Sequence, residues 1–308
     1  MFDELHHADW STGASKRWVA SAWRTSAGWV VVGPRRVGRS DLFVDALIDT
    51  GRSRRVLAGF DFSIGLPLAY GLLTEFSGFR EALPALGHKP GWEDFFNVSA
   101  QSDDVTFRRP FYPRTATKGV SRSTLTSGIG VASFSDLLRQ CERGGPGRRE
   151  ACSVFWTLGG NQVGRAATSG WQEVVRPALA QGATLWPFDG DLRALSARSG
   201  LVLAETYPAD AYFILGAPFG RRESKTSQAD RRSKAASIIA WSSAAGVDLG
   251  EAREPLLDGF GASSSGEDPF DALAGLLAMI EVVEKRAPEA VTQVGLEVAA
   301  WEGWIVGR

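Results

Sequence analysis

Apolar residues near the start of the chain fall into three short runs with the spacing of β-strands. The runs cover residues 5–11, 18–23 and 28–33, and the third is rich in β-branched valine. Because the connections between these runs are short, we expect the strands to be antiparallel neighbours. The pattern predicts a three-stranded meander at the start of the fold.

A helix and a buried strand follow the meander. Ser40 can cap a helix over residues 41–49, and Gly51 can end it. Residues 56–62 are then apolar on both faces except for Asp61, which is typical of a buried parallel strand. A strand after such a helix normally returns parallel to an earlier strand through a right-handed crossover. Three antiparallel strands, a helix and a parallel strand, in this order, open the ribonuclease-H-like fold.

The next part of the chain is predicted to form helices and loops. We expect helices at residues 134–143 and 162–180 and a short strand at residues 185–188, and strand-like core sequence resumes at residues 201–207. Residues 68–200 are therefore interpreted as an insertion in a single domain that spans residues 1–308. Further helices are expected at residues 209–215, 228–245 and 268–286. The expected fold is α/β, with a mixed five-stranded sheet flanked by helices and a large, mainly helical insertion after the fourth strand.

The composition narrows the class of protein without indicating a partner. Apolar residues make up 44% and charged residues 22% of the 308 residues, a balance typical of folded domains. The net charge of −1 neither indicates nor excludes nucleic-acid binding. Two cysteines, Cys141 and Cys152, are too few for a disulfide framework. With no signal-peptide pattern and no apolar stretch of about 20 residues, the sequence predicts a soluble cytoplasmic protein without a membrane partner. No pattern indicates an oligomeric state.

Two aspartates fall on predicted strands that would be parallel neighbours. Asp9 ends the first strand, and Asp61 lies within the buried fourth strand. Open α/β sheets hold their sites at the carboxyl ends of such strands, so the two carboxylates are expected to lie close together. A buried carboxylate needs a metal, a cation or hydrogen bonds. The simpler alternative is that each one caps a turn or pairs with an arginine.

A second acidic pair begins the last long helix. Asp268 and Asp271 are three residues apart and share one helix face with Gly275. Asp268 followed by Pro269 also has the pattern of a helix start, with an N-cap aspartate and proline at the first helical position. Two interpretations therefore remain open for Asp268, a cap and a ligand. Asp271 is the better candidate for chemistry, although a first-turn acid is also favoured by the helix dipole.

Converging carboxylates suit magnesium or manganese, which favour hard oxygen ligands. Two such ions about 3.5–4 Å apart can support phosphodiester cleavage. Histidine-based sites fit less well, because His6 and His7 would face opposite sides of a strand and His88 stands alone. The expected cofactor is therefore Mg²⁺ or Mn²⁺.

Five sequence pieces in order resemble the domain-of-unknown-function family 429, whose members are described as predicted ribonuclease-H-like nucleases. The pieces are ADWS at residues 8–11, GFDFSIGLP at 59–67, ETYP at 205–208, DPFDALA at 268–274 and EGWI at 302–305. The resemblance covers roughly residues 5–67 and 201–308. It implies the fold, a metal ion and a hydrolase, and it names no substrate.

The resemblance also implies roles for individual residues. Asp9, Asp61 and Asp271 fall where ribonuclease-H-like nucleases of the resolvase type hold metal ligands, and Asp268 would be a fourth ligand. Glu205 matches the family's acidic residue at the fifth strand and would support the site. The helix carboxylate of ribonuclease H itself has no certain match, which argues against a true ribonuclease H.

Candidate substrate-binding residues lie outside the acidic set. Asn161 and Gln162 follow two glycines and precede a predicted helix, whose start can bind a phosphate. Arg221, Arg222 and Lys225 form a basic stretch that could contact a phosphate backbone. A tight turn and an ordinary solvated surface are the respective alternatives.

The sequence predicts a metal-dependent nuclease or phosphodiesterase acting on nucleic acid or another phosphoester. The alternative is a non-catalytic module of the same fold that binds nucleic acid or protein through the insertion. A nucleotide-handling enzyme is a third possibility, but the paired phosphate-binding hairpins of that class are not found in the sequence. Fold analogy does not decide among them.

Overall fold

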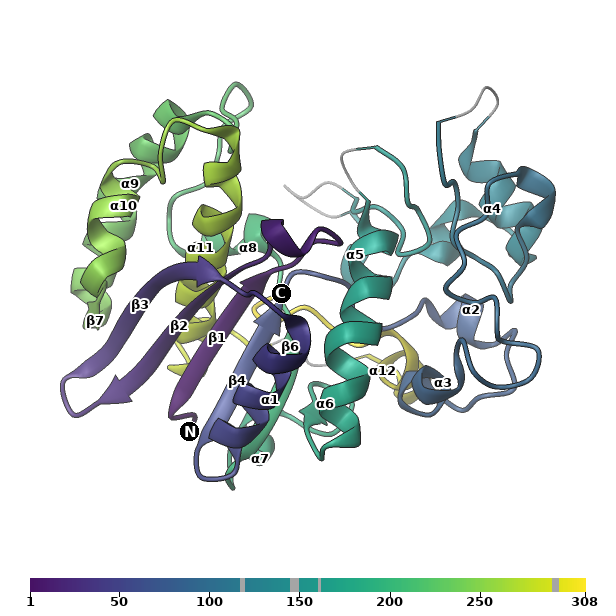
Figure 1. Cartoon of the computed structure of the whole chain (residues 1–308), viewed down its shortest axis with the longest axis horizontal. Coiled ribbons are helices and arrows are strands. Elements are labelled where there is room, and N and C mark those ends of the chain that lie inside the picture. Colours follow the sequence, from purple (N-terminus) through teal and green to yellow (C-terminus); the bar gives the residue numbers. More distant parts are fainter. Residues whose placement is uncertain (117–119, 145–149, 160–161, 290–293) are drawn as a thin grey trace. The chain divides into compact units, whose positions relative to one another are not determined.

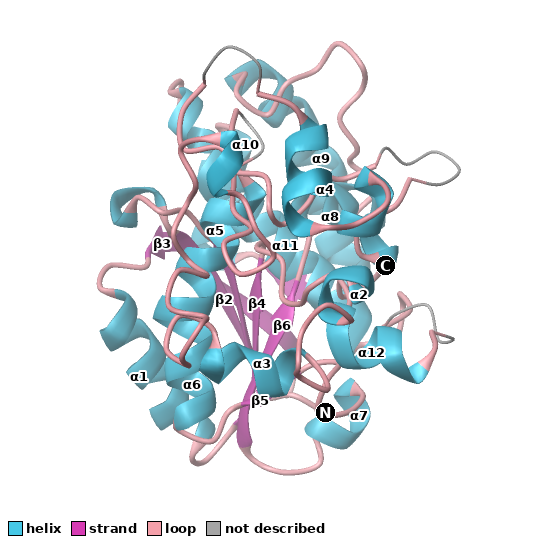
Figure 2. Cartoon of the chain, turned by 90° about the vertical axis from the view of Figure 1, so that its right-hand side faces the viewer, coloured by secondary structure: helices cyan, strands magenta, loops and turns pink. Residues whose placement is uncertain are grey.

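The strands of the chain assemble into one mixed sheet in the computed structural model, which describes residues 1–116, 120–144, 150–159, 162–289 and 294–308 (Figure 1). Within these residues the sheet has seven strands in the order β5-β6-β4-β1-β2-β3-β7. The strands are β1 (Glu4–Asp9), β2 (Trp18–Thr25), β3 (Gly28–Arg36), β4 (Arg55–Phe60), β5 (Thr184–Leu185), β6 (Gly200–Glu205) and β7 (Val247–Asp248). Figure 2 shows the central strands side by side in magenta.

The pairing confirms the predicted meander and the predicted parallel return. Strand β1 pairs antiparallel with β2, and β2 pairs antiparallel with β3. Strand β4 lies parallel to β1 on one side and to β6 on the other. The expected number of five strands is wrong, because β5 and β7 extend the two edges. Strand β5 overlaps the short strand expected at residues 185–188 only at Leu185, and β7 was not predicted, because two residues are too few to produce an alternating pattern in the sequence.

Two helices cover opposite faces of the central strands. Helix α1 (Ser40–Gly51) packs on one face, where Phe43 meets Phe60 of β4 edge to face. Helix α11 (Glu267–Val283) packs on the other face, where His7 of β1 lies against it. Alternation along β1 and β4 explains the division, since His7 pairs with Gly59 while the next pair, Ala8 and Phe60, faces the other way.

Asp61 and Asp268 occupy different positions from those predicted, relative to the end of β4 and the start of α11. Strand β4 ends at Phe60, so Asp61 follows the strand and does not lie within it. Helix α11 begins at Glu267 with Gly266 at its N-cap, so Asp268 is in the first turn and the interpretation as a cap is wrong. Asp61 therefore still lies at the carboxyl end of β4, and Asp268 still lies at the start of α11.

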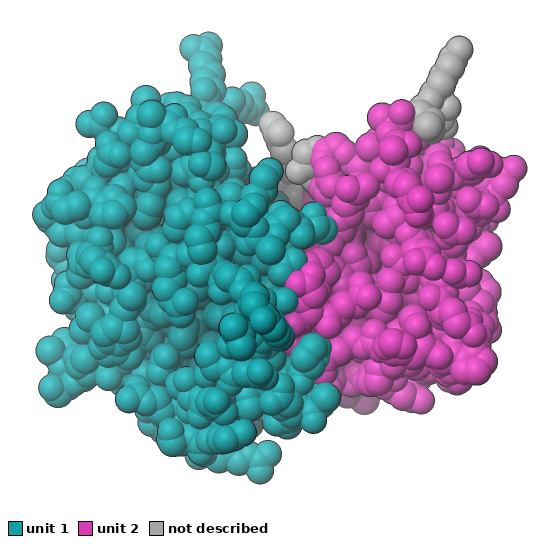
Figure 3. All heavy atoms as spheres, viewed as in Figure 1, with its two compact units in different colours: residues 1–61, 177–291, 305–308 teal, residues 62–176, 292–304 magenta. Residues whose placement is uncertain are grey.

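The chain divides into two compact units, coloured separately in Figure 3. Unit 1 contains residues 1–61, 177–291 and 305–308, and it holds the whole sheet. Unit 2 contains residues 62–176 and 292–304. The remaining helices of unit 1 in the described residues are α7 (Leu192–Leu195), α8 (Pro208–Ile214), α9 (Gln228–Ala245), α10 (Arg253–Leu257) and all but the first residue of α6 (Arg176–Ala180). The predicted helices at 209–215 and 228–245 correspond to α8 and α9.

Unit 2 is built from helices and loops. Its helices are α2 (Leu68–Gly71), α3 (Phe79–Ala85), α4 (Arg122–Ile129), α5 (Val163–Gly170) and α12 (Leu296–Glu302). A π-helical segment, Trp171–Val175, continues α5 and leads into α6 (Arg176–Ala180), in agreement with the helix predicted at 162–180. The helix predicted at 134–143 is wrong. Two 3₁₀ turns, Phe134–Leu137 and Gln140–Glu142, stand there, separated by the extended residues Leu138 and Arg139.

Unit 2 contains a buried ionic network. Arg139 is fully buried and donates from Nε to Glu142 Oε1 at 2.9 Å and from Nη1 to the Glu302 carbonyl at 3.0 Å. The Glu142 carboxylate also accepts from the Arg139 backbone N–H and from the Ser63 hydroxyl. The Glu302 carboxylate accepts from the backbone N–H groups of Leu68 and Gln140. Every carboxylate in this network is met by donors, as a buried charge requires.

Two further features bear on the predicted class of protein. Among the described residues, no helix combines the length and apolar character that crossing a bilayer needs. The cysteines are not joined to each other, and Cys141 is buried whereas Cys152 is half-buried.

Candidate functional site

The carboxyl ends of β1 and β4 bring Asp9 and Asp61 together. The two strands run parallel in a register that pairs Ala8 with Phe60. Asp9 follows Ala8 as the last residue of β1, and Asp61 follows Phe60 directly after the end of β4. Both lie two positions beyond the pair His7 and Gly59, and their side chains therefore project to the face that α11 covers. The Trp10 backbone N–H donates to Asp61 Oδ1 at 2.7 Å. The Asp9 carboxyl in turn hydrogen bonds to Asp61.

A hydrogen bond between two carboxyl groups needs a proton, and the pKa values reflect this. Burial, followed by repulsion from Asp61, Asp271 and Asp268, raises the pKa of Asp9 well above its usual range. Burial also raises the pKa of Asp61 to about 7, although the hydrogen bond from Trp10 acts in the opposite direction. Two carboxylates held this close do not both ionise easily, so the pair retains a proton near neutral pH.

Helix α11 approaches the sheet closely enough to add a third carboxylate. A Cβ atom at Gly275 would lie only 2.2 Å from the His7 ring, so only glycine allows this approach. His7 Nδ1 lies 3.0 Å from the Ala272 carbonyl and Nε2 lies 2.8 Å from the Thr206 hydroxyl. Burial lowers the pKa of His7 to about 4, so the ring is neutral and fixes the helix against β1. The contact places Asp271, one residue before Ala272, close to the aspartate pair.

Asp271 is buried, and both of its oxygens have partners. The Tyr212 hydroxyl of α8 donates to Oδ1, and Lys225 Nζ lies 2.5 Å from Oδ2. Burial raises the pKa of Asp271 even though Lys225 and Tyr212 favour its ionised form. Burial and the neighbouring Asp271 also raise the pKa of Tyr212 well above its ordinary value, so the phenol remains a donor.

The first turn of α11 adds two more acidic groups. Glu267 Oε1 lies 3.2 Å from Lys225 Nζ. Asp268 is half-buried one turn before Asp271, and burial together with repulsion from Glu267 and Asp271 raises its pKa. These five acidic side chains, Asp9, Asp61, Glu267, Asp268 and Asp271, are called the carboxylate cluster below.

Glu205 is not brought into the carboxylate cluster. It is the last residue of β6, is buried, and pairs with Phe60 of β4. Neighbours in a parallel pair share a face, so the Glu205 side chain points to the face of Phe60 and away from that of Asp61. The following residue, Thr206, faces the cluster side and hydrogen bonds with His7.

The predicted substrate-binding residues are scattered. Arg221 and Arg222 are exposed in the connection between α8 and α9. Lys225, in the same connection, is the one that reaches the carboxylate cluster. Gln162 is exposed at the start of α5 in unit 2, and Asn161 lies outside the described residues.

Sequence reasoning missed two groups that touch Asp271. Tyr212 was not a candidate, and Lys225 was considered only as a phosphate contact. No local motif marks either residue, because both come from segments more than 40 residues before α11 in the chain. A tyrosine in a helix that follows a sheet strand is the only signal, and it is weak.

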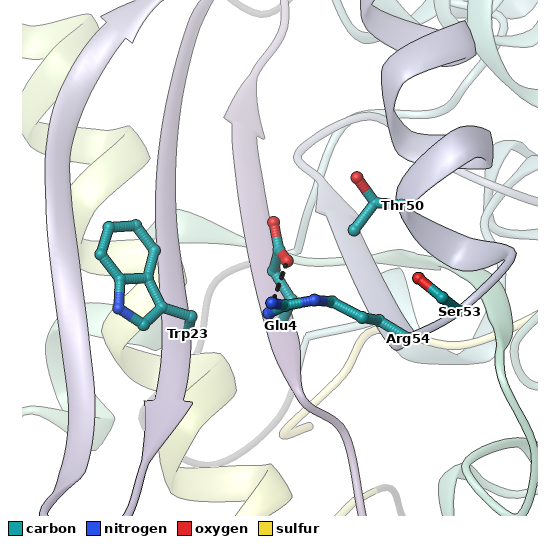
Figure 4. A pocket seen from close by; sticks show the side chains of 5 residues that line it. All are labelled: Glu4, Trp23, Thr50, Ser53 and Arg54. Carbon is teal, nitrogen blue, oxygen red and sulfur yellow. Dashed lines mark ion pairs between the residues drawn. The ribbon is translucent and has the colours of Figure 1, made fainter.

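Within the described residues, no three histidine, cysteine or acidic side chains are spaced so as to hold a metal ion as they stand. The structure also has an open hollow elsewhere in unit 1, lined by Glu4, Trp23, Thr50, Ser53 and Arg54 (Figure 4). It lies at the amino end of β1, away from Asp9, and Arg54 Nη1 is 3.6 Å from Glu4 Oε2. None of the predicted site residues lines this hollow.

Comparison of the chain with protein-family models, with curated proteins and with solved structures finds no match. The resemblance to family 429 therefore stays a prediction that rests on the five sequence pieces. The geometry of the carboxylate cluster carries the functional argument.

Proposed function

We propose that this protein is a metal-dependent phosphodiesterase or nuclease of the ribonuclease-H-like class. The core of the sheet has the order β6-β4-β1-β2-β3, with an antiparallel meander and a parallel return. This is the strand order expected of that class, and the two short edge strands lie outside it. The assignment of the class nevertheless rests on topology alone, so the chemistry has to be argued from the site.

The observation that carries the proposal is the proton-sharing pair formed by Asp9 and Asp61. Burial raises the pKa of both carboxyl groups at the ends of these adjacent parallel strands, and Asp61 raises the pKa of Asp9 further, so ionising both costs stability. Acids with perturbed pKa values gather at functional sites, where burial and neighbouring charges adjust the pKa to the chemistry. A hard divalent cation would relieve the repulsion, which makes the pair a fitting donor set.

Magnesium or manganese, when bound, would supply positive charge that neutralises the carboxylates and stabilises a phosphoester's developing charge. Asp9 and Asp61 would hold it, with Asp268 as a further candidate for support. For the pair to bind a cation, the proton between the carboxyl groups has to leave, so binding should strengthen as the pH rises, because the pKa values of both groups are raised. Tyr212 and Lys225 keep Asp271 ionised and oriented beside the pair.

A hydrolysis assay tests the proposal. The full chain is incubated with Mn²⁺ or Mg²⁺ and, in separate reactions, with single-stranded DNA, duplex DNA, RNA and a small phosphodiester. We expect metal-dependent cleavage of at least one substrate and a loss of 100-fold or more in Asp61→Asn and Asp9→Asn. Asp45→Asn is the matched control, because Asp45 is exposed on α1 and contacts Gln181. Activity that survives in Asp61→Asn, or no cleavage of any substrate, would contradict the proposal.

A non-catalytic binding module is the second candidate, and one observation favours it. Both oxygens of Asp271 are already engaged by Tyr212 and Lys225, as they would be in a carboxylate with a purely structural role. This alternative predicts that Asp9→Asn binds nucleic acid or protein as well as the unaltered chain does, with no turnover. Gel-shift titration of both proteins distinguishes it from the enzyme.

A further inference from the structure

The sheet carries an arginine stacked on a tryptophan beside the end of β1. Strand β2 begins at Trp18, opposite Asp9, and β3 ends at Arg36, opposite Trp18. Directly opposed residues of antiparallel strands share a face, so the three side chains form a row on the face where α11 packs. The Arg36 guanidinium lies 4.1 Å from the centre of the Trp18 ring. The row therefore continues from the aspartate pair to the outer strand of the meander.

The Arg36 guanidinium is held in place and is also open to solvent. Its Nη1 donates to the Ser15 carbonyl, and the Trp18 ring supports the planar group. Arg36 is nevertheless exposed. A guanidinium fixed in this way loses little freedom when a further flat ring stacks on it, and arginine planes stack on unpaired bases in this manner.

A second pair of the same kind, close by in the sequence, shows what a structural stack looks like. Arg17 lies 4.0 Å from the centre of the Trp10 ring, but both residues are buried. The Arg17 guanidinium donates to the carbonyls of Ser11 and Thr12 in the turn after β1. Arg17 thus holds the turn together, whereas Arg36 presents its charge at the surface.

Packing alone does not account for the tryptophan at position 18. Trp18 is half-buried, and its Nε1 is enclosed without a hydrogen-bond partner in the described part of the chain. An enclosed donor without an acceptor costs stability, and a phenylalanine would avoid that cost. Indole is the aromatic ring that attracts a guanidinium most strongly. The residue therefore fits a role in positioning Arg36.

A lysine adds a second exposed cation beside the row. Lys16 ends the 3₁₀ turn Ala14–Lys16 between β1 and β2 and is exposed. Burial raises the pKa of Asp268, while the charges of Lys16 and Arg36 act in the opposite direction, so both cations lie within electrostatic reach of that acid. Trp18, Arg36 and Lys16 are called the stacking platform below.

We propose that the stacking platform binds single-stranded nucleic acid beside the carboxylate cluster, with an unpaired base stacked on the Arg36 guanidinium and a neighbouring phosphate paired with Lys16. The inference rests on the proposed function for the chemistry that follows binding, and it specifies the form of the substrate. In a duplex the bases are stacked on one another and paired, so no base face is free for Arg36. Arg36 and Lys16 act here as binding residues, and Trp18 is a positioning residue.

Binding of an oligonucleotide to the full chain, without metal, tests the inference. A fluorescently labelled single strand of DNA and the blunt duplex formed from it are each titrated at pH 7 in the presence of a chelator, and anisotropy is recorded. We expect the single strand to bind at least tenfold more tightly than the duplex. Equal affinity for the two, or no binding of the single strand, would overturn the inference.

Three variants separate the stack from the charge. Arg36→Ala should weaken binding of the single strand at least tenfold, as the loss of a stacked base does. Arg36→Lys keeps the charge without the planar group, so it should also lose affinity, by threefold or more. Lys16→Ala should reduce the slope of log Kd against log salt concentration by about 0.7, the contribution of one phosphate contact on a single strand. Unchanged affinity in Arg36→Ala or Arg36→Lys would overturn the stacking, and an unchanged slope in Lys16→Ala would overturn the phosphate contact.

Arg52→Ala is the matched control. Arg52 is 75% exposed and lies just before β4, at the opposite end of the strands from Asp61. The variant removes the same charge as Arg36→Ala, so it separates a local contact from the effect of net charge. We expect its affinity to stay within twofold of the unaltered chain. A loss as large as that of Arg36→Ala would overturn the assignment to the stacking platform.

Failure of the inference differs from failure of the proposed function. If Arg36→Ala binds the single strand as well as the unaltered chain does, while metal-dependent cleavage is lost in Asp61→Asn, the proposed function stands and the stacking platform is wrong. If binding depends on Arg36 but no substrate is cleaved with either metal, the stacking platform stands and the proposed hydrolysis is wrong.

Discussion

The two units of the molecule treat enclosed acids in opposite ways, with Glu142 and Glu302 buried in unit 2 and Asp9 and Asp61 half-buried in unit 1. In unit 2, the carboxylates of Glu142 and Glu302 accept hydrogen bonds from Arg139, from backbone N–H groups and from a hydroxyl. In unit 1, Asp9 and Asp61 share a hydrogen bond with each other, and burial raises the pKa of both. The same residue chemistry therefore gives a satisfied network in one unit and a repelling pair in the other.

The difference distinguishes a structural role in unit 2 from the functional role that we propose in unit 1. A buried ion pair that is fully matched with donors holds loops together, and removing one partner leaves a buried charge alone. A pair of carboxyl groups with no cation beside it destabilises the fold when both groups are ionised. Such a pair is expected where binding or catalysis requires it. The comparison predicts opposite signs for substitutions in the two places.

The largest expected effect is in the matched network. Arg139→Met should destabilise the protein by about 3–5 kcal/mol, because the buried Glu142 carboxylate would lose its cation and the Ile64 and Glu302 carbonyls would lose a donor. Urea unfolding followed by circular dichroism measures the change. Arg143→Met is the control, since Arg143 is exposed nearby and should matter little. A loss below about 1 kcal/mol would show that the network is not structural.

A smaller effect of opposite sign is expected at the repelling pair. Asp61→Asn keeps the acceptor for the Trp10 N–H and removes one charge, so at pH 8 without metal it should stabilise the fold by on the order of 2 kcal/mol, allowing for partial exposure. Urea unfolding in the presence of a chelator measures it. Destabilisation by a similar amount would mean that Asp61 is held by donors, as the acids of unit 2 are.

The same pair should give the stability a distinctive dependence on pH. The pKa of Asp61 is about 7 in the folded chain and near 4 when unfolded, so the folded state binds the proton more tightly. The stabilisation from this proton is complete below pH 4 and is lost as the pH rises through 7. His7, whose pKa falls to about 4, acts in the opposite direction over pH 4–6.5.

The difference between the unaltered chain and Asp61→Asn isolates the aspartate from His7. We expect the advantage of the variant to grow between pH 4 and pH 7 and to level off above. Thermal unfolding in metal-free buffers across this range provides the measurement. A constant difference at every pH would exclude a raised pKa at Asp61.

The smallest expected effect concerns Asp271. Its oxygens have donors, as the acids of unit 2 do, but burial raises its pKa, as it does for Asp9 and Asp61. Tyr212→Phe removes the hydroxyl that donates to Oδ1 while Lys225 stays in place, so the loss of stability should be about 1 kcal/mol. Tyr207→Phe is the control, because Tyr207 is 40% exposed. Urea unfolding compares the two variants. An equal change in both would place Asp271 with the unmatched acids.

Much of the sheet could be predicted from the sequence, because most of its strands are long enough to show a pattern of apolar residues. Strands β1 to β4 and β6 are long enough to show alternation or continuous apolar character, and α9 has a full pattern with a serine cap. The two-residue edge strands β5 and β7 are formed by pairing with neighbours, so β7 was not predicted and β5 was expected at residues 185–188, which share only Leu185 with it. The 3₁₀ turns at 134–142 were mistaken for a helix because their apolar residues also recur at helical spacing.

The candidate site was predictable in part. Asp9 and Asp61 could be paired because strand order and direction fix which residues become neighbours. Asp271 required only that α11 lie close to β1, which the small residue Gly275 indicated. The contacts of Tyr212 and Lys225 with Asp271 could not be predicted, because long-range contacts of single side chains leave no periodic pattern in the sequence. Glu205 shows the limit most clearly, since one residue of register decides the face on which its carboxylate lies.

The location of a bound ion tests the central claim most directly. Crystals of the unaltered chain are soaked in Mn²⁺ at pH 8, and the metal is located by its anomalous scattering. We predict a peak about 2.2 Å from carboxylate oxygens of both Asp9 and Asp61, with their shared hydrogen bond broken. No peak there, with the two carboxyl groups still hydrogen bonded to each other, would contradict the account.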